Sequence, residues 1–83
     1  THRMESNFVL QKEKCMDYQD LGRRVRMQRL QLDWTQERLA KAIGVGTSFV
    51  GHIERGTRVA SLCTLYSICA VLGVKLDYVV AGE

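Results

Sequence analysis

Two short helical patterns joined by a tight turn occupy residues 35–58, and they constrain the fold more than any other part of the chain. The segment reads TQERLAKAIGVGTSFVGHIERGTR. Thr35 is placed to cap the first helix, and Gly44 is placed to end it in a left-handed turn. The second helix is predicted over residues 47–55, and Gly56 ends it. Two helices held at a fixed angle by so short a turn form a compact unit with one exposed helix.

The apolar residues of this segment fall on one side of each helix. Leu39, Ala40 and Ile43 recur at helical spacing in the first helix, and Val50 and Ile53 do so in the second. These side chains are expected to point inward. The outward positions of the second helix are then Thr47, Ser48, Gly51 and His52.

Length and composition indicate one small globular domain. A chain of 83 residues buries only about 60% of the surface that its unfolded form exposes. A hydrophobic content of 46% with 25% charged residues is typical of a folded globular chain. No apolar run is long enough to cross a membrane, and the N-terminus lacks the apolar stretch of a signal peptide. We therefore expect a cytoplasmic protein that makes no contact with a membrane.

Three further helices are predicted around the central pair, which makes the fold all-α with five helices. The first covers residues 18–31 with Asp17 as its N-cap, the fourth covers 61–72, and a short fifth covers 77–81. The apolar stripe of the fourth helix is predicted to consist of Leu62, Leu65, Ile68, Cys69 and Leu72.

The domain is predicted to span residues 17–83, after an N-terminal extension of residues 1–16. The first three residues precede Met4 and are interpreted as tag-derived. Residues 4–16 have no strong periodicity, which leaves open a frayed segment, a short helix or an arm.

The positive charge is concentrated around the central pair of helices. The chain as a whole has a net charge of +3. Residues 23–58 hold eight basic and three acidic residues, a net charge of +5, and the remainder of the chain has −2. A basic surface on the exposed helix pair is the charge distribution expected of a nucleic-acid-binding face.

Other kinds of site are not indicated by the sequence. Three cysteines without C-x-x-C spacing argue against a disulfide framework and a zinc site, and Cys63 and Cys69 are expected in the core. His52 has no neighbouring metal ligand. No arrangement of nucleophile, base and orienting acid is recognisable, and no glycine-rich phosphate loop is present. We therefore expect no enzyme, cofactor, metal ion or small-molecule ligand.

The motifs TQERLA, GV and IERGTR resemble the Cro/phage-repressor type (XRE-like) of helix-turn-helix protein. LGRRVRMQRLQLDWT upstream and SLCTLYSICAVLGVKLDYVV downstream are similar to the first helix and to the last two helices of that family. The resemblance covers about residues 18–82. It implies a compact five-helix, lambda-repressor-like bundle that binds double-stranded DNA and regulates transcription. One departure is Ala60, which stands where the family often has a proline before the fourth helix.

The resemblance also implies roles for individual residues. The base-reading positions match Thr47, Ser48, Gly51 and His52, and the phosphate contacts match Gln36, Arg29, Arg55, Thr57 and Arg58. Arg29 and Glu54 match a pair that ties the first helix to the end of the recognition helix. Because family members bind as symmetric dimers, we expect a homodimer, with Tyr78, Val79 and Val80 as its interface.

The favoured function is therefore a dimeric transcriptional regulator, interpreted as a repressor, on a palindromic operator. Two alternatives use the same fold. One is an antitoxin that holds a toxin through residues 4–16 and regulates its own synthesis, and the other is a restriction–modification controller protein. A domain that interacts only with proteins is disfavoured, because it would have no need for the phosphate-contact set.

Overall fold

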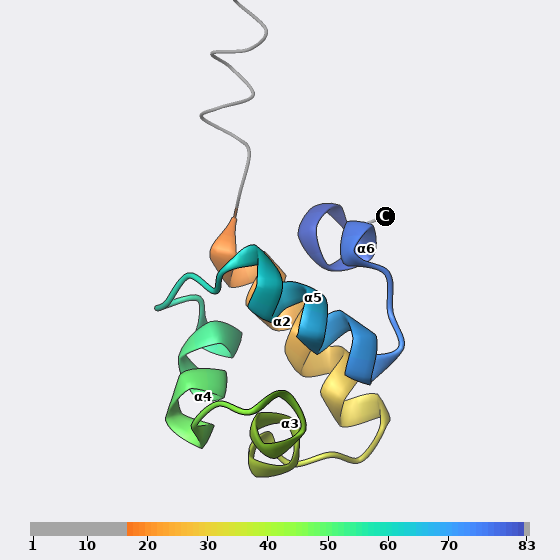
Figure 1. The fold of residues 1–83 in the computed structure, drawn as a ribbon. Coiled ribbons are helices and arrows are strands. Elements are labelled where there is room, and N and C mark those ends of the chain that lie inside the picture. Colours follow the sequence, from red (N-terminus) through yellow and green to blue (C-terminus); the bar gives the residue numbers. More distant parts are fainter. Residues whose placement is uncertain (1–16, 83) are drawn as a thin grey trace, which may run out of the picture.

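The computed structural model describes residues 17–82, which form five helices. These are α2 (Tyr18–Gln31), α3 (Gln36–Ile43), α4 (Thr47–Arg55), α5 (Leu62–Leu72) and α6 (Leu76–Ala81). Figure 1 shows them wound into one bundle. The predicted all-α, five-helix fold is confirmed. The expectations for residues 1–16 lie outside the described residues. Among residues 17–82, no helix is long and apolar enough to span a bilayer.

Local capping chemistry sets the helix ends. Asp17 accepts hydrogen bonds from the backbone N–H groups of the first turn of α2, and the Thr35 hydroxyl accepts one from Arg38 N at 3.0 Å. Gly44 ends α3 with φ at 78°, a left-handed conformation that side chains disfavour. The predicted bounds of α2 and α4 match the structure, while α5 and α6 begin at Leu62 and Leu76.

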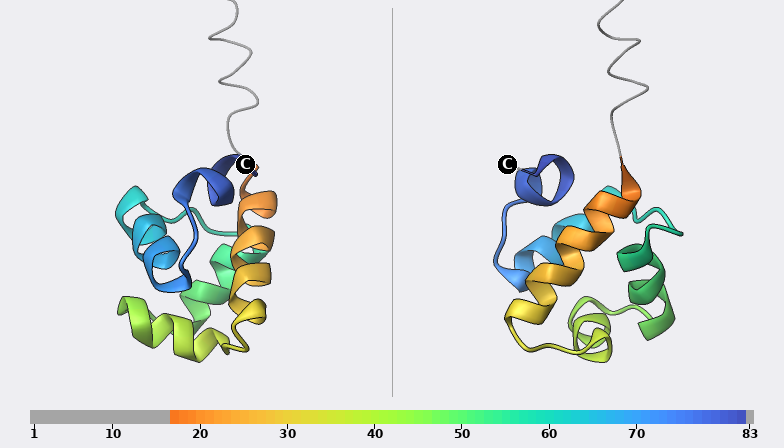
Figure 2. Two further views of the ribbon diagram at one scale, coloured as in Figure 1. Left: turned by 90° about the vertical axis from the view of Figure 1, so that its right-hand side faces the viewer. Right: turned by 180° about the vertical axis from the view of Figure 1, so that it is seen from behind.

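The core lies where all five helices meet. In the left view of Figure 2, α5 lies at one side of the molecule and α2 at the opposite side. α4 packs against α2 and α3, α3 packs against α5, and α6 contacts both α2 and α5. The buried apolar side chains are Leu21, Val25, Leu39, Ala40, Val50, Ile53, Leu65, Ile68, Cys69, Leu72 and Val79.

The N-terminal half of α2 approaches the C-terminal end of α4 so closely that only glycine fits between them. A Cβ atom on Gly22 would lie 2.5 Å from the carbonyl oxygen of Glu54 and would also overlap that of Ile53. Because no side chain separates the two backbones at this crossing, α2 and α4 are in direct backbone contact there. Gly22 cannot be singled out from the sequence, because its environment is formed by residues more than thirty positions away.

Two expectations for α5 are wrong. Leu62 is 69% exposed, and Cys63 is exposed as well, whereas Cys69 is buried as predicted. Cys63 precedes the buried Leu65 by two residues, which places it about 200° around the helix and therefore on the outer side. Leu62 belongs to the first turn, where side chains lean toward the N-terminus and past the helices that cover the rest of the stripe.

Candidate DNA-binding surface

The first turn of α4 presents small polar side chains to the exterior. Thr47 and Ser48 are both exposed, while Val50 and Ile53 on the inner face are buried. Gly46 caps the helix without a side chain, so no side-chain hydrogen bond reaches the first backbone N–H groups. These N–H groups give this end of α4 a partial positive charge.

The other two predicted base-reading positions are less open. His52 is half-buried, and its Nδ1 atom lies 2.9 Å from the Thr57 hydroxyl oxygen. Gly51 is buried, although its position on α4 faces two residues of the molecular surface, Gln36 and Arg55. A Cβ atom there would lie 3.0 Å from Nη1 of Arg55 and 3.6 Å from Oε1 of Gln36. These two longer side chains therefore cover the glycine.

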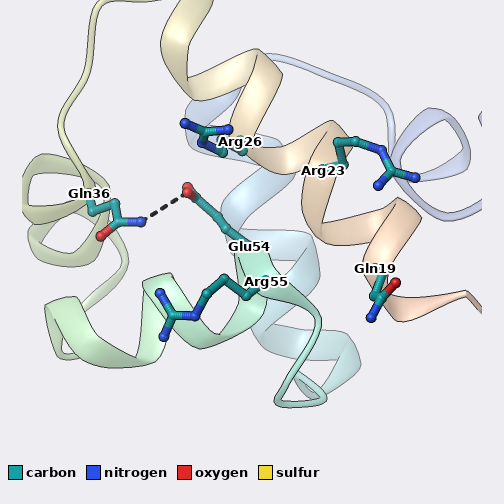
Figure 3. A pocket seen from close by; sticks show the side chains of 6 residues that line it. All are labelled: Gln19, Arg23, Arg26, Gln36, Glu54 and Arg55. Carbon is teal, nitrogen blue, oxygen red and sulfur yellow. Dashed lines mark hydrogen bonds between the residues drawn. The ribbon is translucent and has the colours of Figure 1, made fainter.

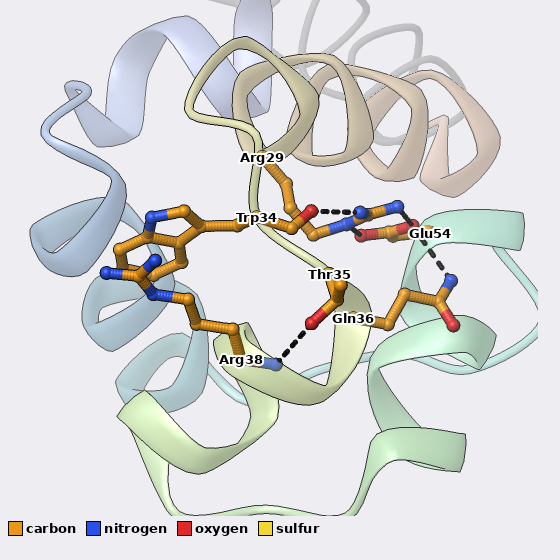
Figure 4. A network of polar contacts seen from close by, with 6 residues as sticks. All are labelled: Arg29, Trp34, Thr35, Gln36, Arg38 and Glu54. Carbon is orange, nitrogen blue, oxygen red and sulfur yellow. Dashed lines mark hydrogen bonds and ion pairs between the residues drawn. The ribbon is translucent and has the colours of Figure 1, made fainter.

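A buried ion pair connects α2, α3 and α4. Nε of Arg29 donates to Oε2 of Glu54 at 2.6 Å, and its Nη2 donates to Oε1 at 3.0 Å. Nε2 of Gln36 donates to Oε1 at 3.1 Å, and Nη1 of Arg29 donates to the carbonyl oxygen of Trp34 at 2.6 Å. Arg29 and Glu54 are each only 6% exposed. Figure 4 shows this network spanning the turn between α2 and α3.

The network gives Arg29 a structural position. Each of its three guanidinium nitrogens already donates to a protein oxygen, and its side chain is buried. A buried charge pair of this kind holds its elements firmly, since removing one partner leaves the other charge without compensation. The expected pairing with Glu54 is present, and Arg29 in this pair is only 6% exposed.

A basic hollow lies between α2, α3 and α4. Figure 3 shows its lining, which consists of Gln19, Arg23, Arg26, Gln36, Glu54 and Arg55. Arg23 pairs with Asp20 one turn earlier on α2. The Glu54 carboxylate at this hollow is already compensated by Arg29, so the hollow retains excess positive charge. An anionic group such as a phosphate is the ligand that this charge would attract.

The loop after α4 continues the basic surface. Thr57 and Arg58 are both exposed, and the Arg58 guanidinium lies 5.9 Å from the centroid of the Phe49 ring. The Thr57 backbone N–H donates to the carbonyl oxygen of His52 at 3.0 Å, and the Thr57 hydroxyl adds a second hydrogen bond to the same oxygen at 3.2 Å. Side chains in this loop are therefore oriented by α4 itself.

Two arginines on the basic half of the sequence serve other purposes. Arg24 donates from Nε to the carbonyl oxygen of Val79 at 2.9 Å and from Nη2 to that of Val80 at 3.2 Å. The Arg38 guanidinium lies 4.5 Å from the centroid of the Trp34 ring, a cation–π contact. Arg24 therefore fastens α6 to α2, a role that the sequence analysis did not identify because the partners lie 55 residues away.

The expected interface residues at the C-terminus are largely internal. Val79 is fully buried in the core, and Tyr78 and Val80 are half-buried. Val79 thus has no side-chain surface to offer a partner. α6 has six residues, and four of them, Leu76, Tyr78, Val79 and Val80, pack in or against the hydrophobic core. Between Asp17 and Gly82, no group of three potential metal ligands is close enough to hold an ion.

Known proteins share both the sequence pattern and this architecture. The helix-turn-helix family profile matches residues 25–79. The uncharacterized HTH-type transcriptional regulator YazB of Bacillus subtilis is 37% identical over 68 residues, which is 82% of this chain and 99% of that protein.

Two solved structures have the same fold. The restriction–modification controller protein C.AhdI of Aeromonas hydrophila has a TM-score of 0.73 and 32% identity, covering 76% of this chain and 96% of that one. The c2 repressor of P22, solved in complex with a synthetic operator, also has a TM-score of 0.73, with 27% identity over the same shares of the two chains.

The chain therefore belongs to the Cro/phage-repressor type of helix-turn-helix family. This family consists of DNA-binding transcriptional regulators and not of enzymes, in agreement with the sequence analysis.

Proposed function

We propose that this protein is a sequence-specific transcriptional repressor that binds a palindromic operator as a homodimer, in the cytoplasm. The observation that carries the proposal is the exposed first turn of α4, which presents Thr47 and Ser48 on the same helix that lines the basic hollow with Arg55. A helix presented in this way fits the major groove, where each base pair has its own pattern of donors and acceptors.

In this proposal α4 reads bases with short side chains. The hydroxyl groups of Thr47 and Ser48 donate to or accept from base edges, and the Thr47 methyl group contacts a thymine methyl. His52 supplies a further donor when its ring exchanges the contact with the Thr57 hydroxyl for one with a base edge. Gly51 contributes by the absence of a side chain, which leaves room for Gln36 and Arg55. Such a set lacks bidentate readers, so DNA shape and bridging waters add to the specificity.

Phosphate contacts fix the position of α4 on the duplex. We assign them to Gln36, Arg55, Thr57 and Arg58, which surround α4 on its exposed side. Arg29 acts indirectly, because its pair with Glu54 holds the end of α4 against α2. Gln36 combines a phosphate contact with a structural role. Its amide nitrogen donates to Glu54, while its amide oxygen Oε1 is directed toward Gly51.

The test is selection of bound duplexes from a random DNA library at moderate salt. The proposal predicts an enriched motif with two-fold symmetry and half-sites about 34 Å apart, one turn of DNA. The Thr47→Ala/Ser48→Ala variant should bind DNA with little sequence preference, because it lacks the hydroxyl groups that contact the base edges. Both side chains are exposed, so the variant should still fold. An unenriched library with binding only at low salt would contradict the proposal, because it would indicate purely electrostatic binding.

A second candidate function is that of a restriction–modification controller protein. The likeness to C.AhdI, at 32% identity over nearly the whole of that chain, favours it. A controller also binds DNA, so the two functions differ in the genes that are regulated. A binding site upstream of adjoining restriction and methylation genes would support the controller, and its absence would favour the general repressor.

A further inference from the structure

Phe49 is the one large apolar side chain of α4 that the core does not enclose. Val50 and Ile53 are 1% and 2% exposed, whereas Phe49 is half-buried and packs against the core with only part of its surface. The same helix carries Thr47 and Ser48 on its exposed first turn. Part of the Phe49 ring therefore remains open on the helix that is proposed to enter the major groove.

The position of Phe49 on α4 places it at the border of the groove-facing side. At about 100° per residue, it lies about 60° around the helix from His52 and about 160° from Thr47. It lies about 120° from Arg55, which lines the basic hollow. Phe49 thus stands next to His52, on the flank of α4 that faces away from the hollow.

The Arg58 guanidinium covers the Phe49 ring. Its central carbon Cζ lies 5.9 Å from the ring centroid, within the range of a cation–π contact. Such a contact uses the face of the guanidinium and leaves its N–H groups free to donate in the guanidinium plane. Because Arg58 is exposed, these groups can donate to a phosphate while the guanidinium stays over the ring. The stack holds the ring beside a point of phosphate contact.

We propose that the open part of the Phe49 ring contacts the C5-methyl group of a thymine in the operator, which makes Phe49 a specificity-determining residue. The inference rests on the proposed function, which places α4 in the major groove. Thymine presents a methyl group there, and phenylalanine is one of the side chains that contact it. A cytosine at the same place has no methyl group, and its amino group would lose water against the ring without gaining a partner.

This contact adds discrimination that the other readers of α4 lack. Thr47, Ser48 and His52 have short or single-contact side chains, and Gly51 has none. The methyl group of Thr47 also suits a thymine, but it lies about 160° around the helix from Phe49. The two residues should therefore contact different nucleotides, so each half-site should contain two thymines whose methyl groups matter.

Replacing single thymines of the selected operator with deoxyuridine tests the contact on the wild-type chain. Uracil pairs as thymine does and lacks only the methyl group. At the thymine that faces Phe49, the dissociation constant measured by fluorescence anisotropy should rise about fourfold, the value of one buried methyl group. In Phe49→Ala and Phe49→Gln the same replacement should leave the constant nearly unchanged, because the ring is absent. Phe49→Gln keeps a side chain of similar length to pack against the core.

Two further variants serve as matched controls. Arg38→Ala removes another cation–π contact, the one with Trp34 at 4.5 Å, and should keep the fourfold effect of uracil. Thr47→Ser removes only the Thr47 methyl group. It should abolish the effect of uracil at a different thymine and preserve the effect at the thymine assigned to Phe49. Circular dichroism melting establishes that each variant is folded.

A second pair of duplexes identifies the source of the methyl group, because 5-methylcytosine presents the same group as thymine. Cytosine in place of the assigned thymine should weaken binding, and 5-methylcytosine should regain about fourfold relative to cytosine. Tighter binding of the 5-methylcytosine duplex than of the thymine duplex would overturn the assignment to thymine.

The outcomes separate this inference from the proposed function. A random library that yields no operator would contradict the proposed function, and this inference with it. An operator in which no uracil replacement has an effect would overturn the inference alone. The same holds if every effect of uracil persists in Phe49→Ala and Phe49→Gln, because the ring would then contact no methyl group.

Discussion

Replacing Glu54 with alanine should strongly destabilise the domain. The substitution removes the carboxylate that accepts two hydrogen bonds from Arg29 and one from Gln36, and it leaves a guanidinium that is 6% exposed without its counter-ion. Breaking a buried pair in this way costs about 3–5 kcal/mol. The whole domain is expected to be stable by only about 4–12 kcal/mol, so the loss is a large fraction of the total.

Thermal unfolding followed by circular dichroism measures this loss. One kcal/mol corresponds to about 4–8 °C for a domain of this size, so the midpoint should fall by about 12 °C or more. Glu54→Gln should fall between the wild type and Glu54→Ala, because the amide oxygen still accepts a hydrogen bond. DNA affinity should weaken in the same order, since the end of α4 loses its attachment to α2.

The matched control is Glu37→Ala on α3. Glu37 also pairs with a basic residue, Lys41, but the pair is exposed and its atoms are 3.9 Å apart. Exposed pairs of this spacing contribute about 0.3–0.5 kcal/mol, so the midpoint should barely move. Equal shifts for Glu54→Ala and Glu37→Ala would refute the reasoning, because burial would then have no influence on the cost.

Three further predictions concern separate parts of the domain. Gly22→Ala should lower the free energy of unfolding by about 3 kcal/mol or more in a urea titration, because its Cβ atom would overlap the backbone of α4; an unchanged midpoint would contradict the close approach. Arg55→Ala should weaken binding to operator and unrelated duplexes alike and reduce the salt slope of log K by about one, as measured by fluorescence anisotropy, whereas loss at the operator alone would argue for base contact. Burial raises the pKa of the Cys69 thiol. The stability that the neutral thiol contributes is therefore fully present below the pKa of an unfolded cysteine, about 8.5, and is lost as the pH rises through the pKa of the folded state. Alkylation should accordingly be much slower at Cys69 than at exposed Cys63, and the alkaline loss of stability should diminish in Cys69→Ala.

The helix ends could be predicted from the sequence because capping is local. Asp17 and Thr35 contact backbone groups two or three residues away, and Gly44 adopts a conformation that its own lack of a side chain permits. The pairing of Arg29 with Glu54 was expected from the family resemblance and not from the local pattern.

Features that depend on distant residues could not be predicted in this way. The close approach at Gly22 and the attachment of α6 by Arg24 both join residues more than thirty positions apart. α5 presents a different difficulty, because a helix with apolar residues on all sides gives no periodic signal of which side is buried. This explains why Leu62 and Cys63 were assigned to the core and are exposed.

The central claim is that α4 reads DNA sequence, and the most direct test is the ratio of two dissociation constants. Fluorescence anisotropy at physiological salt would compare the duplex obtained by selection with a scrambled duplex of the same composition. For the wild-type chain the selected duplex should bind at least about 10³-fold more tightly, as specific regulators do. In Thr47→Ala/Ser48→Ala the ratio should collapse while binding to the scrambled duplex is retained. A wild-type ratio near one, or a ratio unaffected by changing α4, would contradict the account.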